Sequence, residues 1–160
     1  MSTAATNKKV IAITGASSGI GKETAKQLVN NGFNVALLAR SKDKLRSMVE
    51  ELGNDNAFAV KADVSDFKDV DTAFEKVSKH FGRIDGIFAN AGRGAKAAGI
   101  EKGDVDDWDG MLGANVNGLL YTAKAGLPYL RDTQGHFIIT SSVAGRIALK
   151  GSVYGASKWF

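Results

Sequence analysis

Short, continuously apolar runs alternate along the chain with longer stretches of helical periodicity. Such a run has no polar face, so it is typical of a parallel strand that is buried on both faces. Five runs have this character: Val10–Ile13, Val35–Ala39, Ala57–Val60, Ile87–Ala89 and Phe137–Thr140. The pattern therefore predicts five strands that are separated by helices.

The segments after the second, third and fourth runs contain apolar residues spaced three and four apart. This spacing places them on one face of an α-helix. They are Leu45, Met48, Val49 and Leu52, then Val70, Ala73, Phe74 and Val77, and in the last, longer segment Leu112, Val116, Leu119, Leu120, Ala123 and Leu127. We therefore expect an α/β fold: a doubly wound parallel sheet of at least five strands with helices on both faces, in three layers.

Length and composition restrict this picture to one soluble domain. The 160 residues suffice for a single core, and 44% hydrophobic with 24% charged residues is near the globular average. No apolar run reaches membrane-spanning length and residues 1–7 do not resemble a signal peptide, so we expect a cytoplasmic protein without a membrane partner. Cysteine is absent and His80 and His136 are the only imidazoles, so no metal site is expected.

The positive net charge raises the question of nucleic-acid binding. Basic residues exceed acidic ones by 21 to 17, but no cluster of five or more occurs and none is interleaved with aromatic residues. We therefore expect no nucleic-acid partner. A site for one small phosphorylated ligand accounts for the charge equally well.

A glycine-rich turn directly follows the first predicted strand. It reads Thr14-Gly15-Ala16-Ser17-Ser18-Gly19-Ile20-Gly21 and leads into a segment with helical spacing. Glycines permit the tight turn and let the backbone approach a pyrophosphate, while the helix N-terminus offers N–H groups to the anion. The alternative is an ordinary glycine-rich turn, although chance yields this spacing only about 0.01 times in such a chain. The residues expected to bind a dinucleotide are Gly15, Ser17, Ser18, Gly19, Ile20 and Gly21.

The spacing of this turn resembles that of the short-chain dehydrogenase/reductase family, in its compact single-domain branch. It is neither the G-x-G-x-x-G of long-chain dehydrogenases nor the T-G-x-x-G-x-x-G of nucleotide-sugar epimerases. The resemblance extends from Lys8 to Phe160. It implies that residues 1–160 form a single NADP-binding Rossmann domain that lacks its C-terminal strands and substrate lid.

The residues after the second predicted strand indicate which dinucleotide is bound. In a Rossmann unit an acid at this point binds the ribose 2′-hydroxyl of NAD, or an Arg accommodates the 2′-phosphate of NADP. Here Ala39 stands where the acid is expected and Arg40 follows, with Lys42 nearby. The guanidinium and the missing carboxylate favour NADP(H). The alternative is that Arg40 is a solvated residue at the end of a strand.

Two residues after the third predicted strand resemble the family's adenine-binding segment. They are Asp63 and Val64, and Asp63 matches the family's adenine-side Asp. The alternative is a helix-capping role that Asp63 shares with Ser65 and Asp66.

The fourth predicted strand ends in a sequence similar to the family's N-N-A-G. Here it reads Ala89-Asn90-Ala91-Gly92, so that Ala89 replaces the first Asn. In a doubly wound order this strand lies beside the first, and small residues at its end leave room for the nicotinamide ribose. We therefore expect Asn90, Ala91 and Gly92 to border the cofactor.

A tyrosine and a lysine near the C-terminus stand one helical turn apart. This spacing places Tyr154 and Lys158 on one face of a helix, although such a pair is common by chance. Asn115, Ser142, Tyr154 and Lys158 match the family's catalytic Asn, Ser, Tyr and Lys in order, and Tyr154 and Lys158 also match its cofactor contacts. The alternative for Asn115 and Ser142 is a capping role.

These groups suit the transfer of a hydride to a carbonyl. The resulting alkoxide needs a proton, which Tyr154 would supply, and the charge of Lys158 would favour the phenolate form. Ser142 would donate a hydrogen bond to the substrate oxygen. By resemblance, Asn115 would hold a water that links Lys158 to solvent.

The sequence therefore predicts an NADP(H)-dependent oxidoreductase that interconverts an alcohol and a ketone or aldehyde. The alternatives are a non-catalytic dinucleotide-binding sensor or scaffold and an inactive fragment of such an enzyme. Arg93, Lys96, Arg146 and Lys150 suggest an anionic small-molecule substrate, although solvated loop residues are the norm. By resemblance, we expect the full-length protein to be a homo-oligomer, a dimer or a tetramer.

Overall fold

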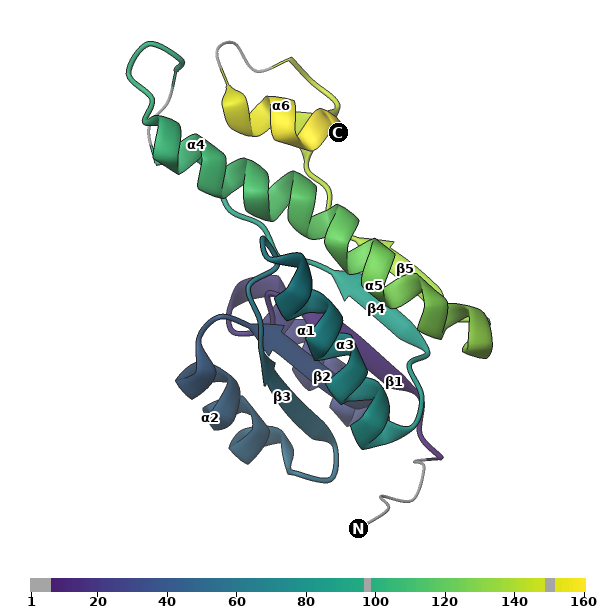
Figure 1. The fold of residues 1–160 in the computed structure, drawn as a ribbon. Coiled ribbons are helices and arrows are strands. Elements are labelled where there is room, and N and C mark those ends of the chain that lie inside the picture. Colours follow the sequence, from purple (N-terminus) through teal and green to yellow (C-terminus); the bar gives the residue numbers. More distant parts are fainter. Residues whose placement is uncertain (1–6, 97–98, 149–151) are drawn as a thin grey trace.

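A computed structural model of the chain describes residues 7–96, 99–148 and 152–160, which form a parallel sheet flanked by helices (Figure 1). The strands are β1 (Val10–Thr14), β2 (Asn34–Ala39), β3 (Ala57–Lys61), β4 (Gly86–Ala89) and β5 (His136–Ile139). The helices are α1 (Gly19–Asn30), α2 (Lys42–Leu52), α3 (Phe67–Phe81), α4 (Val105–Leu112), α5 (Gly118–Thr133) and α6 (Val153–Trp159). The predicted doubly wound α/β fold is confirmed.

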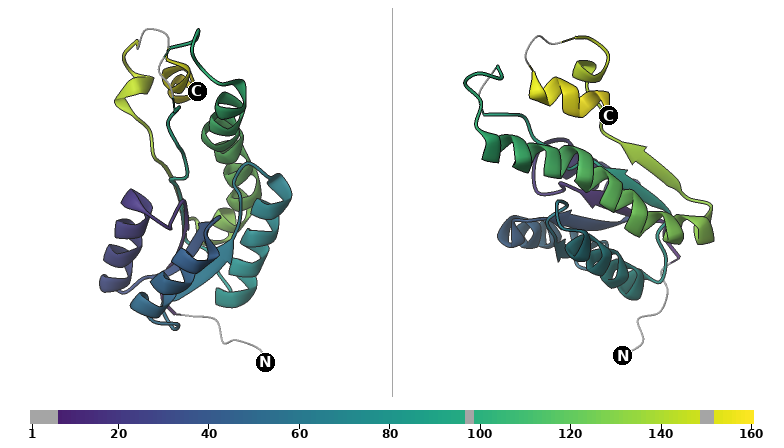
Figure 2. Two further views of the ribbon diagram at one scale, coloured as in Figure 1. Left: turned by 90° about the vertical axis from the view of Figure 1, so that its left-hand side faces the viewer. Right: turned by 45° about the horizontal axis from the view of Figure 1, so that its top comes forward.

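The strands lie in the order β3-β2-β1-β4-β5, and every neighbouring pair is parallel. One hydrophobic cluster packs α1 and α2 on one face of the sheet, and a second packs α3 and α5 on the other (Figure 2). The chain moves outward from β1 in one direction to β3 and in the other direction from β4 to β5. The carboxyl ends of β1 and β4 therefore lie at the point where the strand order reverses, which is where such sheets bind ligands.

The expectation that every strand is buried on both faces is wrong for β5. Ile138 and Ile139 are 58% and 50% exposed, whereas every residue of β2 is buried. Within residues 7–96, 99–148 and 152–160, β5 pairs only with β4 and lies at the edge of the sheet, and α5 packs against one of its faces. The apolar run therefore predicted the strand correctly, but it did not predict how exposed the side chains of the strand are.

The long helical stripe predicted around Leu112–Leu127 also differs from the structure. A π-helical turn, Gly113–Asn117, separates α4 from α5. Small residues of α5, such as Ala125 and Gly126, face the core. The packing at Gly126 is so close that a Cβ there would collide with Ile87 and Phe74. Large residues of the stripe instead face outward, and Leu120 is 48% exposed. Across the described parts of the chain, no helix is both long and apolar enough to cross a membrane.

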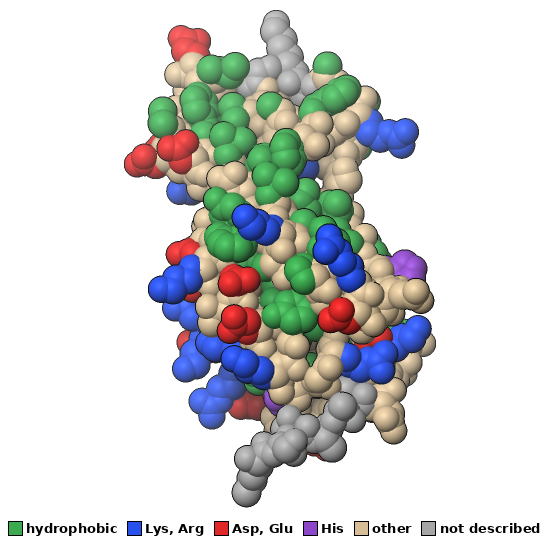
Figure 3. Space-filling view, turned by 45° about the vertical axis from the view of Figure 1, so that its right-hand side comes forward, with side chains coloured by type: hydrophobic (Ala, Val, Ile, Leu, Met, Phe, Trp, Pro, Cys, Tyr) green, Lys and Arg blue, Asp and Glu red, His purple; other side chains and the backbone are tan. Residues whose placement is uncertain are grey.

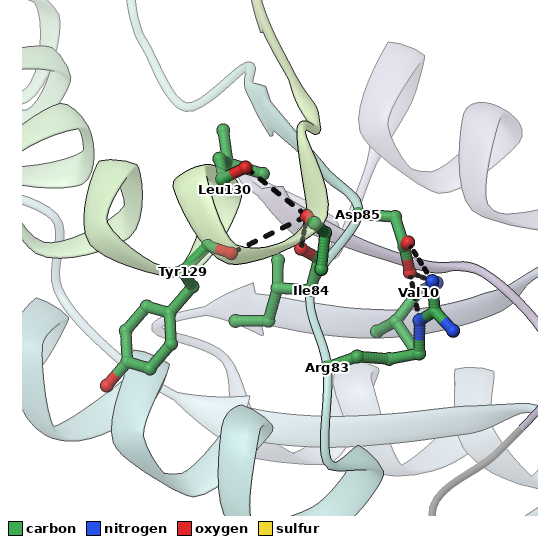
Figure 4. A network of polar contacts seen from close by, with 7 residues as sticks. Val10, Arg83, Ile84, Asp85, Tyr129 and Leu130 are labelled. Carbon is green, nitrogen blue, oxygen red and sulfur yellow. Dashed lines mark hydrogen bonds and ion pairs between the residues drawn. The ribbon is translucent and has the colours of Figure 1, made fainter.

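A polar network fixes the starts of β1 and β4 at the edge of the sheet opposite their carboxyl ends (Figure 4). The buried carboxylate of Asp85 accepts hydrogen bonds from the Val10 N–H at 2.8 Å and from the guanidinium of Arg83. Burial acts to raise the pKa of Asp85, but these donors and the charge of Arg83 lower it below its ordinary value. Thr133 at the end of α5 donates to the Ile84 carbonyl at 2.7 Å. The two central strands are thus held in register by contacts remote from the ligand-binding end.

Candidate active site

The carboxyl ends of the strands border a cleft with a volume of about 1080 Å³. All but one of the residues predicted to bind a cofactor line it: Gly15, Ser17, Ser18, Gly19, Ile20, Arg40, Asp63, Val64, Asn90, Ala91, Gly92, Tyr154 and Lys158. The exception is Gly21, which is buried in α1. A Cβ there would lie 2.6 Å from the Gly15 carbonyl oxygen and 2.7 Å from the Asn90 amide nitrogen. Gly21 therefore acts by close packing and does not border the cleft.

The glycine-rich turn has the backbone conformation that its sequence suggests. Gly15 and Gly19 have φ values of 67° and 52°, which favour glycine. α1 begins within this turn, at Gly19, and the side chain of its N-cap residue, Ser18, makes no capping hydrogen bond. The first N–H groups of α1 have no acceptor within the helix, so they can bind an anion placed at the turn.

Thr14 and Asn90 hold the turn against the ends of β4 and β5. The Thr14 hydroxyl accepts hydrogen bonds from the Asn90 and Ala91 N–H groups, both at 3.1 Å. The Asn90 side chain donates to the Thr14 carbonyl at 3.2 Å and accepts from the Thr140 hydroxyl at 3.0 Å. Sequence reasoning missed Thr14 and Thr140 as supports. Thr14 opens the glycine motif, and that position was the available signal.

Arg40 and Asp63 lie together at the β2–β3 end of the cleft. The Arg40 side chain is 73% exposed, and its Nη1 lies 3.9 Å from Asp63 Oδ2. Asp63 also accepts hydrogen bonds from the Ser65 N–H and hydroxyl; these bonds and Arg40 lower the pKa of Asp63, although burial acts to raise it. The N-cap of α3 is Asp66. Asp63 thus borders the cleft, and Asp66 rather than Asp63 caps α3.

Tyr154 and Lys158 come from α6 and face the cleft beside the end of β5. The Lys158 ammonium lies 5.9 Å from the centre of the Tyr154 ring and donates to the Thr140 carbonyl at 3.5 Å. A Cβ on Gly145 would collide with the Lys158 carbonyl, so the backbone of the 3-10 turn Val143–Gly145 packs directly on α6. Sequence reasoning missed Gly145, because the sequence does not signal its close packing against α6.

Ser142 and Asn115 do not line this cleft. Ser142 is the N-cap of the 3-10 turn, and its hydroxyl accepts a hydrogen bond from the Ala144 N–H at 3.2 Å, while Ser141 borders the cleft instead. Asn115 is buried in the π-turn and borders a second cavity of about 360 Å³, which Lys158 also lines. The structure thus places Lys158 between two cavities, with Tyr154 in the larger one and Asn115 in the smaller.

Those basic loop residues that the structure describes do not form the cluster that an anionic substrate would need. Arg93 lines the cleft, but its guanidinium is paired with the carboxylate of Asp107 at 2.6 Å. Arg146 is exposed and does not border the cleft, and Lys150 lies outside the described residues. Lys96 borders the cleft without this pairing. Pairing with Asp107 thus removes Arg93 from the four residues that suggested an anionic substrate.

The family model and the sequence relatives that match this chain all point to the same family. The profile of the short chain dehydrogenase family matches residues 9–160. An uncharacterized oxidoreductase of Staphylococcus saprophyticus is 40% identical over 153 residues, which cover 94% of this chain and 62% of the relative. An oxidoreductase of Botryotinia fuckeliana is also 40% identical, over 94% of this chain and 56% of its own length. The chain spans about three-fifths of the length of these curated relatives.

Solved structures agree with these sequence relatives. An alcohol dehydrogenase of the archaeon Thermococcus sibiricus, complexed with 5-hydroxy-NADP, matches with a TM-score of 0.89 and 35% identity, over 96% of this chain and 66% of that one. A short chain dehydrogenase/reductase of Burkholderia phymatum, in complex with NAD, matches with a TM-score of 0.89 and 29% identity, over 95% and 56%. Proteins of this architecture thus include both NADP and NAD complexes.

Proposed function

The chain belongs to the short-chain dehydrogenase family, and on that premise we propose that it acts as an NADP(H)-dependent oxidoreductase that interconverts an alcohol and a ketone or aldehyde. One observation carries the proposal. The Tyr154–Lys158 pair and the glycine-rich turn line the same cleft, at the point where the strand order reverses. The cleft thus combines a phosphate-binding turn with a proton donor and a cation.

The residues of the cleft fit a nicotinamide dinucleotide. The volume of the cleft, about 1080 Å³, lies slightly above the usual range for small-molecule sites, so the cleft has room for a large ligand. The glycine-rich turn and the N-terminus of α1 would hold the pyrophosphate, Asp63 and Val64 would border the adenine, and Asn90–Gly92 would border the nicotinamide ribose. Bound there, the cofactor supplies or accepts the hydride.

The preference for NADP(H) rests on the end of the cleft beside β2. Arg40 and Lys44 line it, and the position that carries an acid in NAD-binding Rossmann units is Ala39. Asp63 Oδ2 lies 3.9 Å from Arg40 Nη1, and the Asp63 carboxylate already accepts two hydrogen bonds from Ser65. The Arg40 guanidinium is therefore free to turn toward a phosphate. A 2′-phosphate would therefore meet two cations at this end.

The side chains of this chain would handle the proton. In carbonyl reduction Tyr154 donates its phenolic proton to the substrate oxygen, and Lys158 stabilises the phenolate that remains. Asn115, in the smaller cavity on the other side of Lys158, would hold the water through which Lys158 is linked to solvent. In alcohol oxidation the phenolate removes the hydroxyl proton, so that one pair of residues serves both directions.

Ser142 matches the family's catalytic Ser and is proposed on that ground as the hydrogen-bond donor to the substrate oxygen, although Ser141 is the hydroxyl that borders the cleft in this structure. Its hydroxyl accepts from Ala144, which leaves its own proton available for donation. Ser142→Ala is expected to lower kcat about 10²-fold, in line with the loss of one donor to a developing oxyanion. Ser141→Ala is the matched control, because it removes the neighbouring hydroxyl. A larger loss in Ser141→Ala, measured as initial rates of NADPH consumption, would assign the role to Ser141.

The direct test is cofactor binding followed by turnover. The purified chain is titrated with NADPH and NADH by fluorescence, and NADPH consumption is then measured with a panel of ketones and aldehydes. We expect NADPH to bind more tightly than NADH, and NADPH consumption to require a carbonyl compound. Binding without turnover on any carbonyl would favour a sensor or scaffold, and no binding of either nucleotide would contradict the assignment of the cleft.

A second copy of the chain is the proposed partner of the apolar face of α4 and α5. Leu112, Leu120 and Leu127 are 36%, 48% and 40% exposed there. Hydrophobic side chains gather in the upper half of the face drawn in Figure 3. Burial of such a patch stabilises association, so we expect a dimer or a tetramer, which sedimentation velocity measures directly.

A further inference from the structure

A chain of hydrogen bonds links α4 to the helix that carries Tyr154 and Lys158. It starts at Asp107 in the first turn of α4, whose side chain is 4% exposed. Asp107 Oδ1 accepts from the Arg93 guanidinium at 2.6 Å, the Asp107 carbonyl accepts from the same guanidinium at 2.7 Å, and Asp107 Oδ2 accepts from the Lys96 N–H at 2.7 Å. One carboxylate therefore binds both the beginning and the end of the loop 93–96.

The backbone of Arg93 makes the next link. Its N–H donates to Asn115 Oδ1 and its carbonyl accepts from Asn115 Nδ2, both at 2.9 Å. The same Asn115 amide donates to the Ser157 hydroxyl at 3.0 Å, and this hydroxyl donates to the Tyr154 carbonyl at 2.8 Å. Asn115 thus contacts the loop on one side and α6 on the other.

The backbone that precedes the loop 93–96 lies close to both Asn115 and Lys158. A Cβ on Gly92 would lie 3.0 Å from Asn115 Oδ1 and 3.7 Å from the Lys158 ammonium nitrogen, so the loop backbone is close to both. Gly110 of α4 makes room for Arg93, because a Cβ there would lie 2.9 Å from Arg93 Nη2. A shift of the loop would therefore move Asn115, and with it α6.

We propose that Asp107 and Arg93 are positioning residues, which fix the loop 93–96 so that Asn115 holds Tyr154 and Lys158 in their reactive arrangement. The inference rests on the proposed carbonyl reduction for its effect on rate, but not for its effect on structure. Arg93 contributes a planar fork that binds a carboxylate and a carbonyl together. Its charge and that of Asp107 are thereby used within the protein and are not offered to a substrate.

Electrostatics and burial agree with a fixed pair. The N–H of Lys96 and the guanidinium of Arg93 lower the pKa of Asp107 below its ordinary value, so both contacts favour the charged carboxylate. Asp106, one residue earlier, has the same charge but an exposed side chain. The two neighbouring aspartates therefore differ in partners and burial, and this difference provides the control.

The test compares Arg93→Met and Asp107→Asn with Asp106→Asn. Arg93→Met and Asp107→Asn are expected to lower kcat about 10- to 100-fold, the size of effect that misplaced catalytic groups produce, with the KM for NADPH within about threefold. Asp106→Asn is expected to stay within about twofold of the unmodified chain, since a surface charge contributes little. Arg93→Lys keeps the charge without the fork and is expected to recover only part of the loss.

A structural measurement keeps the inference separate from the proposed function. Nuclear magnetic resonance of the Asn115 side-chain amide, identified through Asn115→Asp, is expected to show slow hydrogen exchange that accelerates in Arg93→Met and Asp107→Asn but not in Asp106→Asn. If the unmodified chain reduces no carbonyl, the proposed function fails while this measurement still decides the inference. Unchanged exchange, or a kcat equal to that of Asp106→Asn, would overturn it. Loss of NADPH affinity in parallel with kcat would also overturn it, because that is the mark of general destabilisation.

Discussion

Tyr154→Phe is expected to lower carbonyl reduction about 10²- to 10⁴-fold, the contribution of a positioned general acid. Phe retains the ring of Tyr154 in the cleft but removes the only group there proposed to protonate the substrate oxygen. The affinity for NADPH is expected to fall by less than about fivefold, the equivalent of one ordinary hydrogen bond. Single-turnover measurements with saturating NADPH separate the rate of reduction from cofactor binding.

The matched control for this change is Tyr121→Phe. Tyr121 lies in α5, where its ring packs edge-on against Phe67 outside the cleft. Its variant removes the same hydroxyl and is expected to reduce carbonyls at the rate of the unmodified chain. Turnover of Tyr154→Phe near that rate would contradict the proposed mechanism, while equal losses in both variants would indicate a nonspecific effect on folding.

Arg40→Asp is expected to reverse the preference between the two cofactors. The variant loses a charge-assisted hydrogen bond to the 2′-phosphate, about 1.5–3 kcal/mol, and adds repulsion, so NADPH should bind about 100-fold more weakly. NADH lacks this phosphate, and the new carboxylate can accept from its ribose 2′-hydroxyl, so its affinity should hold or rise. Parallel fluorescence titrations with NADPH and NADH at one ionic strength measure both changes.

Arg46→Asp provides the control for the change of charge. Arg46 lies on α2, where its side chain is 80% exposed and pairs with Glu50 outside the cleft. This variant makes the same two-unit change in net charge without touching the end of β2. An Arg40→Asp protein that still prefers NADPH, or an Arg46→Asp protein that loses the preference equally, would show that Arg40 does not select the cofactor.

Much of the fold follows from local patterns in the sequence. Each of the five apolar runs overlaps an observed strand, with ends that differ by no more than one residue, as for Val10–Thr14 against the predicted Val10–Ile13. A buried parallel strand needs an apolar side chain at every position, so its signal is strong. The long helix was less predictable, because small residues such as Gly126 face the core and large ones such as Leu120 face outward. The spacing of apolar residues shows that one face of a helix is apolar, but it does not show which part of the protein packs on that face.

The candidate site also has parts that could be predicted from the sequence and parts that could not. The glycine-rich turn could be recognised because phosphate binding requires a fixed order of residues within one short segment. The supports of the site lie far apart in the sequence: Arg93 and Asp107 are separated by 14 residues, and Asn115 and Ser157 by 42. Ser141 and Ser142 are adjacent, and which hydroxyl borders the cleft depends on the turn that follows β5.

The sequence by itself determined the order of strands and helices, the glycine-rich turn after β1 and the spacing of the Tyr154–Lys158 pair. These features depend on residues that are neighbours along the chain, so their spacing is readable without coordinates. Only the tertiary structure decided that Arg93 is neutralised by Asp107, that Gly21 packs behind the cleft, and that Asn115 connects the loop to α6. Such contacts arise when distant segments meet, and a charged or amide side chain has the same appearance in a sequence whether its partner is water or a buried group.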